Sequence, residues 1–144
     1  MSRILFVLFF LGLISRTTAQ QAKLTLLITG IQQQKGIIEA GLYQKAENFP
    51  KTKKQFRIKR VPVNTDTVRI TFTLPAGKDY AIAVYHDTNE NQRCDKNFLG
   101  IPTEKFGFSK NVRPGWGPPS FDEAKITLRN DTTLFIHLIK MFGD

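Results

Sequence analysis

The chain has 144 residues, of which 41 % are hydrophobic, and its formal net charge is +9. This length supplies one domain with its own hydrophobic core rather than several. Cys94 is the single cysteine, which excludes an internal disulfide, so packing has to supply the stability of the fold.

The first residues of the chain predict a signal peptide. Arg3 precedes an apolar run over residues 4–14, and Thr17-Thr18-Ala19 offers a cleavage site of small residues. The run is about eleven residues long, which is short for a bilayer span. We therefore expect residues 1–19 to be removed and residues 20–144 to form an exported domain, periplasmic or extracellular, without a transmembrane segment. An uncleaved membrane anchor is the alternative.

Basic residues are concentrated in one part of the predicted exported domain. Loss of Arg3 and Arg16 lowers the formal charge from +9 to +7, and six of the ten residues 51–60 are Lys or Arg. Outside the cytoplasm, an anionic glycan, a lipid head group or an acidic protein is the expected partner, rather than nucleic acid. The alternative is a solvated strand face that only aids solubility. The residues expected to hold an anionic partner are Lys53, Lys54, Arg57 and Lys59.

Alternation of apolar and polar residues predicts strands along most of the remaining chain. The clearest pattern covers residues 67–74, and residues 80–85 are apolar on both faces, as in a central strand covered on both sides. No apolar stripe of helical period exceeds two turns. The fold predicted is all-β, a single antiparallel β-sandwich of about seven strands, of immunoglobulin-like or transthyretin-like type. The other expected strands lie near residues 24–28, 38–42, 56–63, 124–128 and 132–139.

A long segment without a clear period follows the central strand. It turns polar at His86 and Asp87, and we expect no regular structure until about Phe121, roughly thirty residues later. The segment carries five apolar rings, which are too many to leave in water, so we expect an ordered loop that lies against the domain. These rings are Phe98, Phe106, Phe108, Trp116 and Phe121.

An ordered aromatic loop at one end of a sandwich is a usual place for a binding surface. Phe106, Phe108 and Trp116 are the expected binding residues, and Trp116 stands between Gly115 and Gly117, where it is most easily exposed. The alternative for Trp116 is that it packs over the sheet edge as part of the core.

Oxygen-bearing side chains at the start of the segment have the spacing of a calcium loop. Asp87, Asn89, Asn91 and Asp95 occupy positions 1, 3, 5 and 9, and Arg93 at position 7 would offer its backbone carbonyl. Hard divalent cations such as Ca²⁺ prefer these oxygen ligands. The alternative is a polar turn in which Asp and Asn cap their own backbone.

Two positions depart from an EF-hand. Gln92 stands where glycine is usual at position 6, and Phe98 stands where a bidentate Glu is usual at position 12. No helical pattern flanks the loop. Such a loop would have to take its last carboxylate from elsewhere, and Glu104 and Asp122 are the candidates.

Several short runs in the long segment carry a resemblance to a known family. They are His86-Asp87, an Asn-rich loop closed by Asp95, and the runs at 100–104, 107–109 and 117–121, which read Gly-Ile-Pro-Thr-Glu, Gly-Phe-Ser and Gly-Pro-Pro-Ser-Phe. Together they resemble the bacterial family of secreted proteins known as domain of unknown function 2141. The resemblance covers most of the predicted exported domain and implies a fold and an exported location, but no activity. Gln92 replaces a usual glycine and Cys94 a usual aliphatic residue, which suggests that Cys94 is a small buried hydrophobe.

Residues suited to catalysis are scarce. The sequence has two histidines and no nucleophile elbow, zinc-type spacing or phosphate-binding glycine loop. His137 is expected to be structural. We predict a non-enzymatic binding or structural module, and the less favoured alternative is a hydrolase with its site among His86, Asp87 and Glu104.

Overall fold

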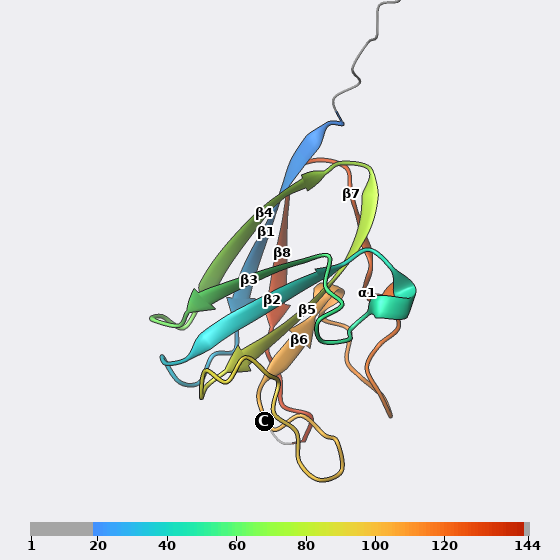
Figure 1. Ribbon diagram of the computed structural model, residues 1–144. Coiled ribbons are helices and arrows are strands. Elements are labelled where there is room, and N and C mark those ends of the chain that lie inside the picture. The colour runs from blue at the N-terminus through green and yellow to red at the C-terminus, as the bar shows by residue number, and fades with distance from the viewer. Residues whose placement is uncertain (1–18, 143–144) are drawn as a thin grey trace, which may run out of the picture.

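The structure, a computed structural model, describes residues 19–142, which form two β-sheets packed face to face (Figure 1). The three-stranded sheet has the order β4-β1-β8, made by Val68–Pro75, Gln21–Thr29 and Thr132–His137. The five-stranded sheet has the order β3-β2-β5-β6, made by Arg57–Pro62, Ile37–Tyr43, Lys78–Asp87 and Phe106–Phe108, with β7 (Ile126–Leu128) paired to the start of β5. The all-β prediction is confirmed. The predicted signal peptide lies outside the described residues except for Ala19.

The main core lies between the two sheets and follows the period of two in the sequence. Along β4, Val68, Ile70, Phe72 and Leu74 are at most 4 % exposed, while the residues between them face outward. β1, β2 and β5 contribute inward-facing residues of the same kind, among them Leu24, Leu26, Ile38, Leu42, Tyr80 and Ile82. Each such side chain stabilises the fold by about 1.5–3 kcal/mol relative to an exposed position.

One strand pair differs from the predicted antiparallel arrangement. β8 runs parallel to β1, with Leu24 opposite Thr132 and Thr29 opposite His137. The reason lies in the turn before β8, which returns the chain to the end of the sandwich where β1 begins. Asp131 in that turn accepts a hydrogen bond from the backbone N–H of Lys23 at 2.7 Å. All other strand pairs in the two sheets of residues 19–142 are antiparallel.

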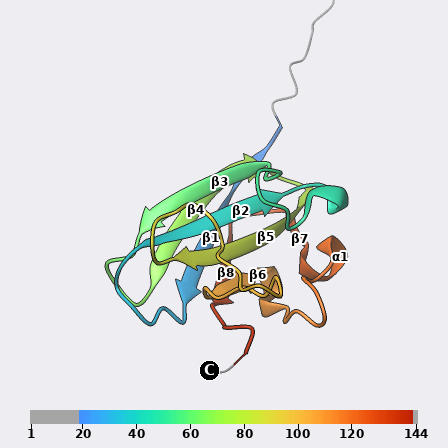
Figure 2. The same cartoon turned by 60° about the horizontal axis from the view of Figure 1, so that its bottom comes forward.

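A second apolar cluster covers the outer face of the five-stranded sheet. Figure 2 shows the strands of this sheet with the bottom of the molecule turned forward. The aromatic rings of the cluster meet edge to face, with the Phe49 ring 5.9 Å from that of Phe108 and 6.2 Å from that of Phe121. β5 is therefore buried on both faces, as its uninterrupted apolar sequence predicted. The cluster contains Tyr43, Phe49, Ala81, Phe106, Phe108, Phe121 and Ala124.

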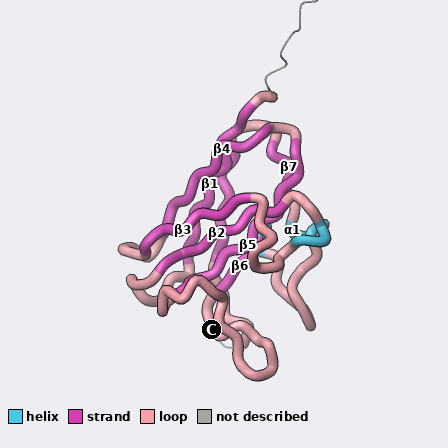
Figure 3. The backbone as a smooth tube through the Cα atoms, in the orientation of Figure 1, coloured by secondary structure: helices cyan, strands magenta, loops and turns pink. Residues whose placement is uncertain are grey.

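The long segment after β5 is more regular than predicted. It contains the short strand β6, the 3₁₀ turn η2 (Ser109–Asn111) and the one-turn helix α1 (Phe121–Ala124), separated by the loops in Figure 3. A second 3₁₀ turn, η1 (Ala46–Asn48), lies between β2 and β3. Ser120 caps α1 by accepting from the N–H of Glu123, whose carboxylate accepts from the N–H of Ser120 in return. None of these helices has the length or the apolar sequence to span a membrane.

The expectation that all five rings of this segment lie against the domain was wrong for two of them. Phe106, Phe108 and Phe121 are at most 9 % exposed, whereas Phe98 is 95 % exposed and Trp116 fully so. β6 pairs directly with β5, which places Phe106 and Phe108 on the apolar outer face. Phe98 and Trp116 lie in loop tips that no strand holds against the sheet.

Substitution of Gly107 should push β6 away from β8, which packs against it. A Cβ atom at Gly107 would lie 2.8 Å from Cγ2 of Ile136 and 3.2 Å from the carbonyl oxygen of His137, whereas one at Gly115 would meet nothing within 4 Å. Gly107→Ala should lower the free energy of unfolding by about 1–3 kcal/mol, because overpacking forces neighbours apart. Gly115→Ala should leave it unchanged in a urea titration. Equal effects of the two substitutions would contradict this packing.

Candidate functional site

The Asp/Asn loop, residues 87–95, is closed by hydrogen bonds among its own groups. The carboxylate of Asp87 accepts from the backbone N–H of Asn91 at 3.1 Å and of Gln92 at 2.7 Å. The side-chain amides of Asn89 and Asn91 donate to the carboxylate of Asp95 at 2.7 to 3.0 Å. The four side chains predicted from their spacing therefore converge.

The backbone of the loop bends where a calcium loop bends. Glu90 and Gln92, at positions 4 and 6, have φ of 58° and 61°, in the left-handed region that position 6 normally fills with glycine. Gln92 thus takes the conformation expected of the glycine that it replaces. Its departure from the usual sequence leaves the shape of the turn intact.

Glu104 hydrogen-bonds to the backbone at both ends of the Asp/Asn loop. Its Oε1 accepts from the backbone N–H of Thr88 at 2.9 Å, and its Oε2 accepts from that of Asp95 at 3.1 Å. The side chain is 8 % exposed and joins the two ends of the Asp/Asn loop from behind. Asp122, the other candidate for a last ligand, lies on α1 and pairs with Lys125 at 2.8 Å instead.

Two electrostatic features distinguish the loop. Hydrogen bonds from Asn91 and Asn89 hold the pKa of Asp95 below its ordinary value of 3.8, so this half-buried carboxylate is charged at neutral pH. Within residues 19–142, no three His, Cys, Asp or Glu side chains are grouped to hold a metal ion. A cation here would therefore need amide and backbone oxygens as well as carboxylates, and the Asp/Asn loop offers both.

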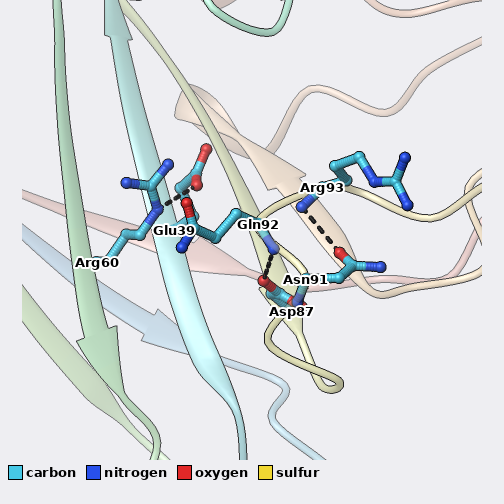
Figure 4. A network of polar contacts seen from close by, with 6 residues as sticks. All are labelled: Glu39, Arg60, Asp87, Asn91, Gln92 and Arg93. Atoms are coloured by element: carbon cyan, nitrogen blue, oxygen red, sulfur yellow. Dashed lines mark hydrogen bonds and ion pairs between the residues drawn. The ribbon is translucent and has the colours of Figure 1, made fainter.

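Figure 4 shows how the loop meets the outer face of the sheet. Gln92 donates from its backbone to Asp87, and its side chain extends over β2 towards Glu39. Glu39 is 3 % exposed and accepts from Nε of Arg60 on the neighbouring strand β3 at 2.7 Å. The buried carboxylate is thereby neutralised by the side chain opposite it in the strand register.

A groove of about 290 Å³ lies beside the loop, on the outer face of the five-stranded sheet. Its floor is formed by outward-facing residues of β2 and β5, including Tyr43, Ala83 and Tyr85. One wall is the continuation of the Asp/Asn loop, residues 94–102, and the other wall is the Trp116 loop, residues 114–118. Its volume is at the lower end of the range of small-ligand sites.

The groove is mainly apolar with a few polar groups. Phe106 and Phe108 line it from β6, and Leu99, Ile101 and Met141 add aliphatic surface. The polar lining residues include Glu39, Gln55 and Lys96. Burial and the charge of Glu39 raise the pKa of the Tyr85 hydroxyl, so this group stays protonated on the floor. The arrangement suits an apolar or aromatic group with a polar end.

The predicted basic residues are all exposed and lie in β3 or just before it. Lys53 and Lys54 lie in the turn before β3. Lys59 donates to the carbonyl oxygen of Thr71 on β4, and its Nζ lies 5.3 Å from the centre of the Phe72 ring. Arg57 lies over the ring of its neighbour Phe56 at 5.7 Å. The last two cations thus cover the open edge between the sheets.

The residues of the hydrolase alternative point in different directions. His86 faces the core side of β5, and its Nε2 lies 2.7 Å from the carbonyl oxygen of Lys35. Asp87 faces the loop, and Glu104 accepts from backbone amides. Burial and the charge of Glu104 raise the pKa of the half-buried Cys94 to about 12, so its thiolate is scarce at neutral pH.

A family model described as an uncharacterized protein conserved in bacteria (DUF2141) matches residues 26–135. The chain belongs to this family. The match begins within β1 and ends within β8, and it includes the Asp/Asn loop and both walls of the groove. No curated protein and no solved structure matches the chain.

The spacing of Asp and Asn identified the Asp/Asn loop, and the aromatic residues of the long segment identified Phe106, Phe108 and Trp116 of the groove. Four other lining residues were missed: Glu39, Tyr43, Tyr85 and Met141. They meet only through strand register and the path of the C-terminal segment. A signal for two of them is present, because Glu39 and Tyr43 alternate with the core residues of β2 and so had to face outward.

Removal of the Glu104 carboxylate should loosen the Asp/Asn loop. Glu104→Ala leaves the amides of Thr88 and Asp95 without their acceptor, which should lower the free energy of unfolding by roughly 2 kcal/mol. Glu104→Gln keeps one acceptor oxygen and should cost about half as much. Urea titration measures both variants. A Glu104→Ala protein as stable as the wild type would show that this side chain does not hold the loop.

Proposed function

We propose that the chain is an exported, non-enzymatic binding module whose groove takes an apolar or aromatic group and whose Asp/Asn loop is fixed by Ca²⁺. The observation that carries the proposal is the continuity of one loop. Its first part draws oxygen-bearing side chains together in a turn with the left-handed residue of a calcium loop, and its second part forms a wall of the groove. An ion that stiffens the first part would therefore hold the binding wall.

The donor set fits a weak calcium site. Asp87, Asn89, Asn91 and Asp95 with the Arg93 carbonyl supply five oxygen positions, and two carboxylates balance the charge of one divalent cation. Water has to complete the six to eight ligands of Ca²⁺, and Glu104 braces the loop from behind. Few charged ligands imply the low affinity of extracellular modules, with dissociation constants of about 0.1–1 mM.

The signal-peptide pattern supports the proposed exported location, and the state of three side chains supports the proposed lack of catalysis. The signal-peptide pattern of residues 1–19 supports export, where calcium is abundant enough for such a site. His86 and Glu104 hydrogen-bond to backbone groups, and burial raises the pKa of Cys94, so its thiol stays protonated at neutral pH. A panel of ester, glycoside and peptide substrates should therefore give no turnover, and turnover abolished by His86→Ala would contradict the proposal.

Calorimetric titration with calcium, together with urea unfolding, tests whether the Asp/Asn loop binds the ion. At about 10 mM calcium the protein should gain roughly 1.4 kcal/mol or more of unfolding free energy, because only the folded loop binds. Asp95→Asn should weaken calcium binding at least about tenfold, since it removes one of two carboxylates. Asp66→Asn, the same change in the exposed turn between β3 and β4, should have no effect. The absence of both heat and stabilisation in the wild type would refute the calcium site.

Calcium binding should also fall in acid. The pKa of Asp95 is below 3.8 in the folded protein, so the carboxylate is present at neutral pH and is lost only as the pH falls through that range. Calcium affinity should therefore be constant from neutral pH down to about pH 5 and fall below about pH 4. Loss of calcium binding already between pH 6 and 7 would point to a different ligand, such as a histidine.

A further inference from the structure

Large apolar side chains are exposed at one end of the molecule. Leu99 and Trp116 lie in the two loops that form the walls of the groove, and Met141 also lines it. Figure 1 shows the loop after β5, the Trp116 loop and the C-terminus extending past the same lower end of the sheets. Four exposed side chains of these segments form what we name the apolar tips: Phe98 (95 % exposed), Leu99 (66 %), Trp116 (109 %) and Phe142 (72 %).

A hydrogen-bonded turn holds the side chains of Phe98 and Leu99 away from the domain. The backbones of Lys96 and Pro102 form an isolated antiparallel β-bridge. The N–H of Asn97 donates to the carbonyl oxygen of Ile101 at 2.8 Å. The side chain of Asn97 accepts from the N–H of Leu99 and of Ile101 at 2.9 and 3.1 Å. The exposure of these two side chains is therefore a property of an ordered hairpin.

The Trp116 tip stands clear of the domain for similar reasons. Three prolines in residues 114–119 restrict its backbone. Cβ atoms placed on Gly115 and Gly117 would meet nothing within 4 Å. The third segment leaves the domain where Ile139 pairs with Phe106 through hydrogen bonds of 2.8 and 3.0 Å.

Basic residues accompany the apolar tips. The segments that carry the apolar tips, residues 96–102, 112–118 and 139–142, contain Lys96, Arg113 and Lys140 and no Asp or Glu. All three basic side chains are exposed. Exposed Trp, Phe and Leu surrounded by Lys and Arg, without acidic residues, is the composition of surfaces that enter the interface of an anionic bilayer.

We propose that the apolar tips insert into the interfacial region of an anionic lipid bilayer, with Lys96, Arg113 and Lys140 bound to the head groups. A second copy of the chain is a poorer occupant, because pairing two such ends would bring like charges together. An apolar ligand in the groove does not account for Phe98, which points away from the domain and is absent from the groove lining. This proposal goes beyond the binding module and does not depend on calcium.

Vesicle partitioning of the exported chain tests the proposal, and Trp116 is the only tryptophan and so reports on its own position. With vesicles of phosphatidylcholine and phosphatidylglycerol, the protein should co-float, its emission should shift to the blue, and brominated acyl chains should quench it. Phosphatidylcholine alone should bind at least about tenfold more weakly. Measurements with calcium and with a chelator separate this outcome from the calcium site, since insertion should occur in both.

Matched variants assign the effect to the tips. Phe98→Ser should weaken partitioning about tenfold, while Phe135→Ser, at an exposed ring on β8, should not. Lys96→Gln with Arg113→Gln should cost on the order of fivefold for each residue at low salt. Lys78→Gln with Arg129→Gln, at the opposite end of β5, should have no effect.

Three results would overturn the proposal. The first is no partitioning to anionic vesicles, whether the protein remains single or self-associates through Trp116. The second is partitioning without a blue shift or quenching, which would show adsorption by charge alone. The third is an equal loss in the tip variants and their controls, which would place the contact elsewhere on the surface.

Discussion

The structure depends on one constraint, the burial of β5 on both faces. Its core side packs between the sheets through Tyr80, Ile82 and Val84, and its outer side carries Ala81 and Ala83, which would otherwise meet water. A sandwich supplies cover for only one face of each sheet. The chain therefore uses the long segment after β5, together with the turn that carries Phe49, to cover the other face.

This second layer explains why a functional site can form where it does. Phe106, Phe108 and Phe121 fix the ends of the covering loops on the sheet, and Ser109, fully buried, accepts from Ile82 and donates to Ala124 beneath them. Between the fixed points the loops stand away from β2 and β5 and leave the groove. Rigid strands thus position loops whose own sequences set the surface chemistry.

The sequence predicted the parts of this arrangement that are local. Alternation predicted the strands of both sheets, the apolar run predicted the doubly covered β5, and the spacing from Asp87 to Asp95 predicted the polar side chains that meet in the loop. The parts that depend on long-range pairing were not visible. β6 is three residues long, so Phe106-Gly107-Phe108 has no period to recognise, and the parallel pairing of β1 with β8 follows from a turn more than a hundred residues away in the sequence. The prediction that Phe98 lies against the domain failed for a different reason. Apolar content alone does not distinguish a ring in the core from a ring at a loop tip.

We propose that calcium fixes the Asp/Asn loop, which Asp87 and Glu104 tie, and that this loop holds the wall of the groove. Residue-resolved amide hydrogen exchange tests it most directly, because the amides of Thr88, Asn91, Gln92 and Asp95 all donate to these two carboxylates. These four amides should exchange slowly, and calcium should slow them further, along with the amides of Asn97 and Ile101 in the wall. Exchange of all six at the rate of an unstructured chain, unchanged by calcium, would contradict the proposal.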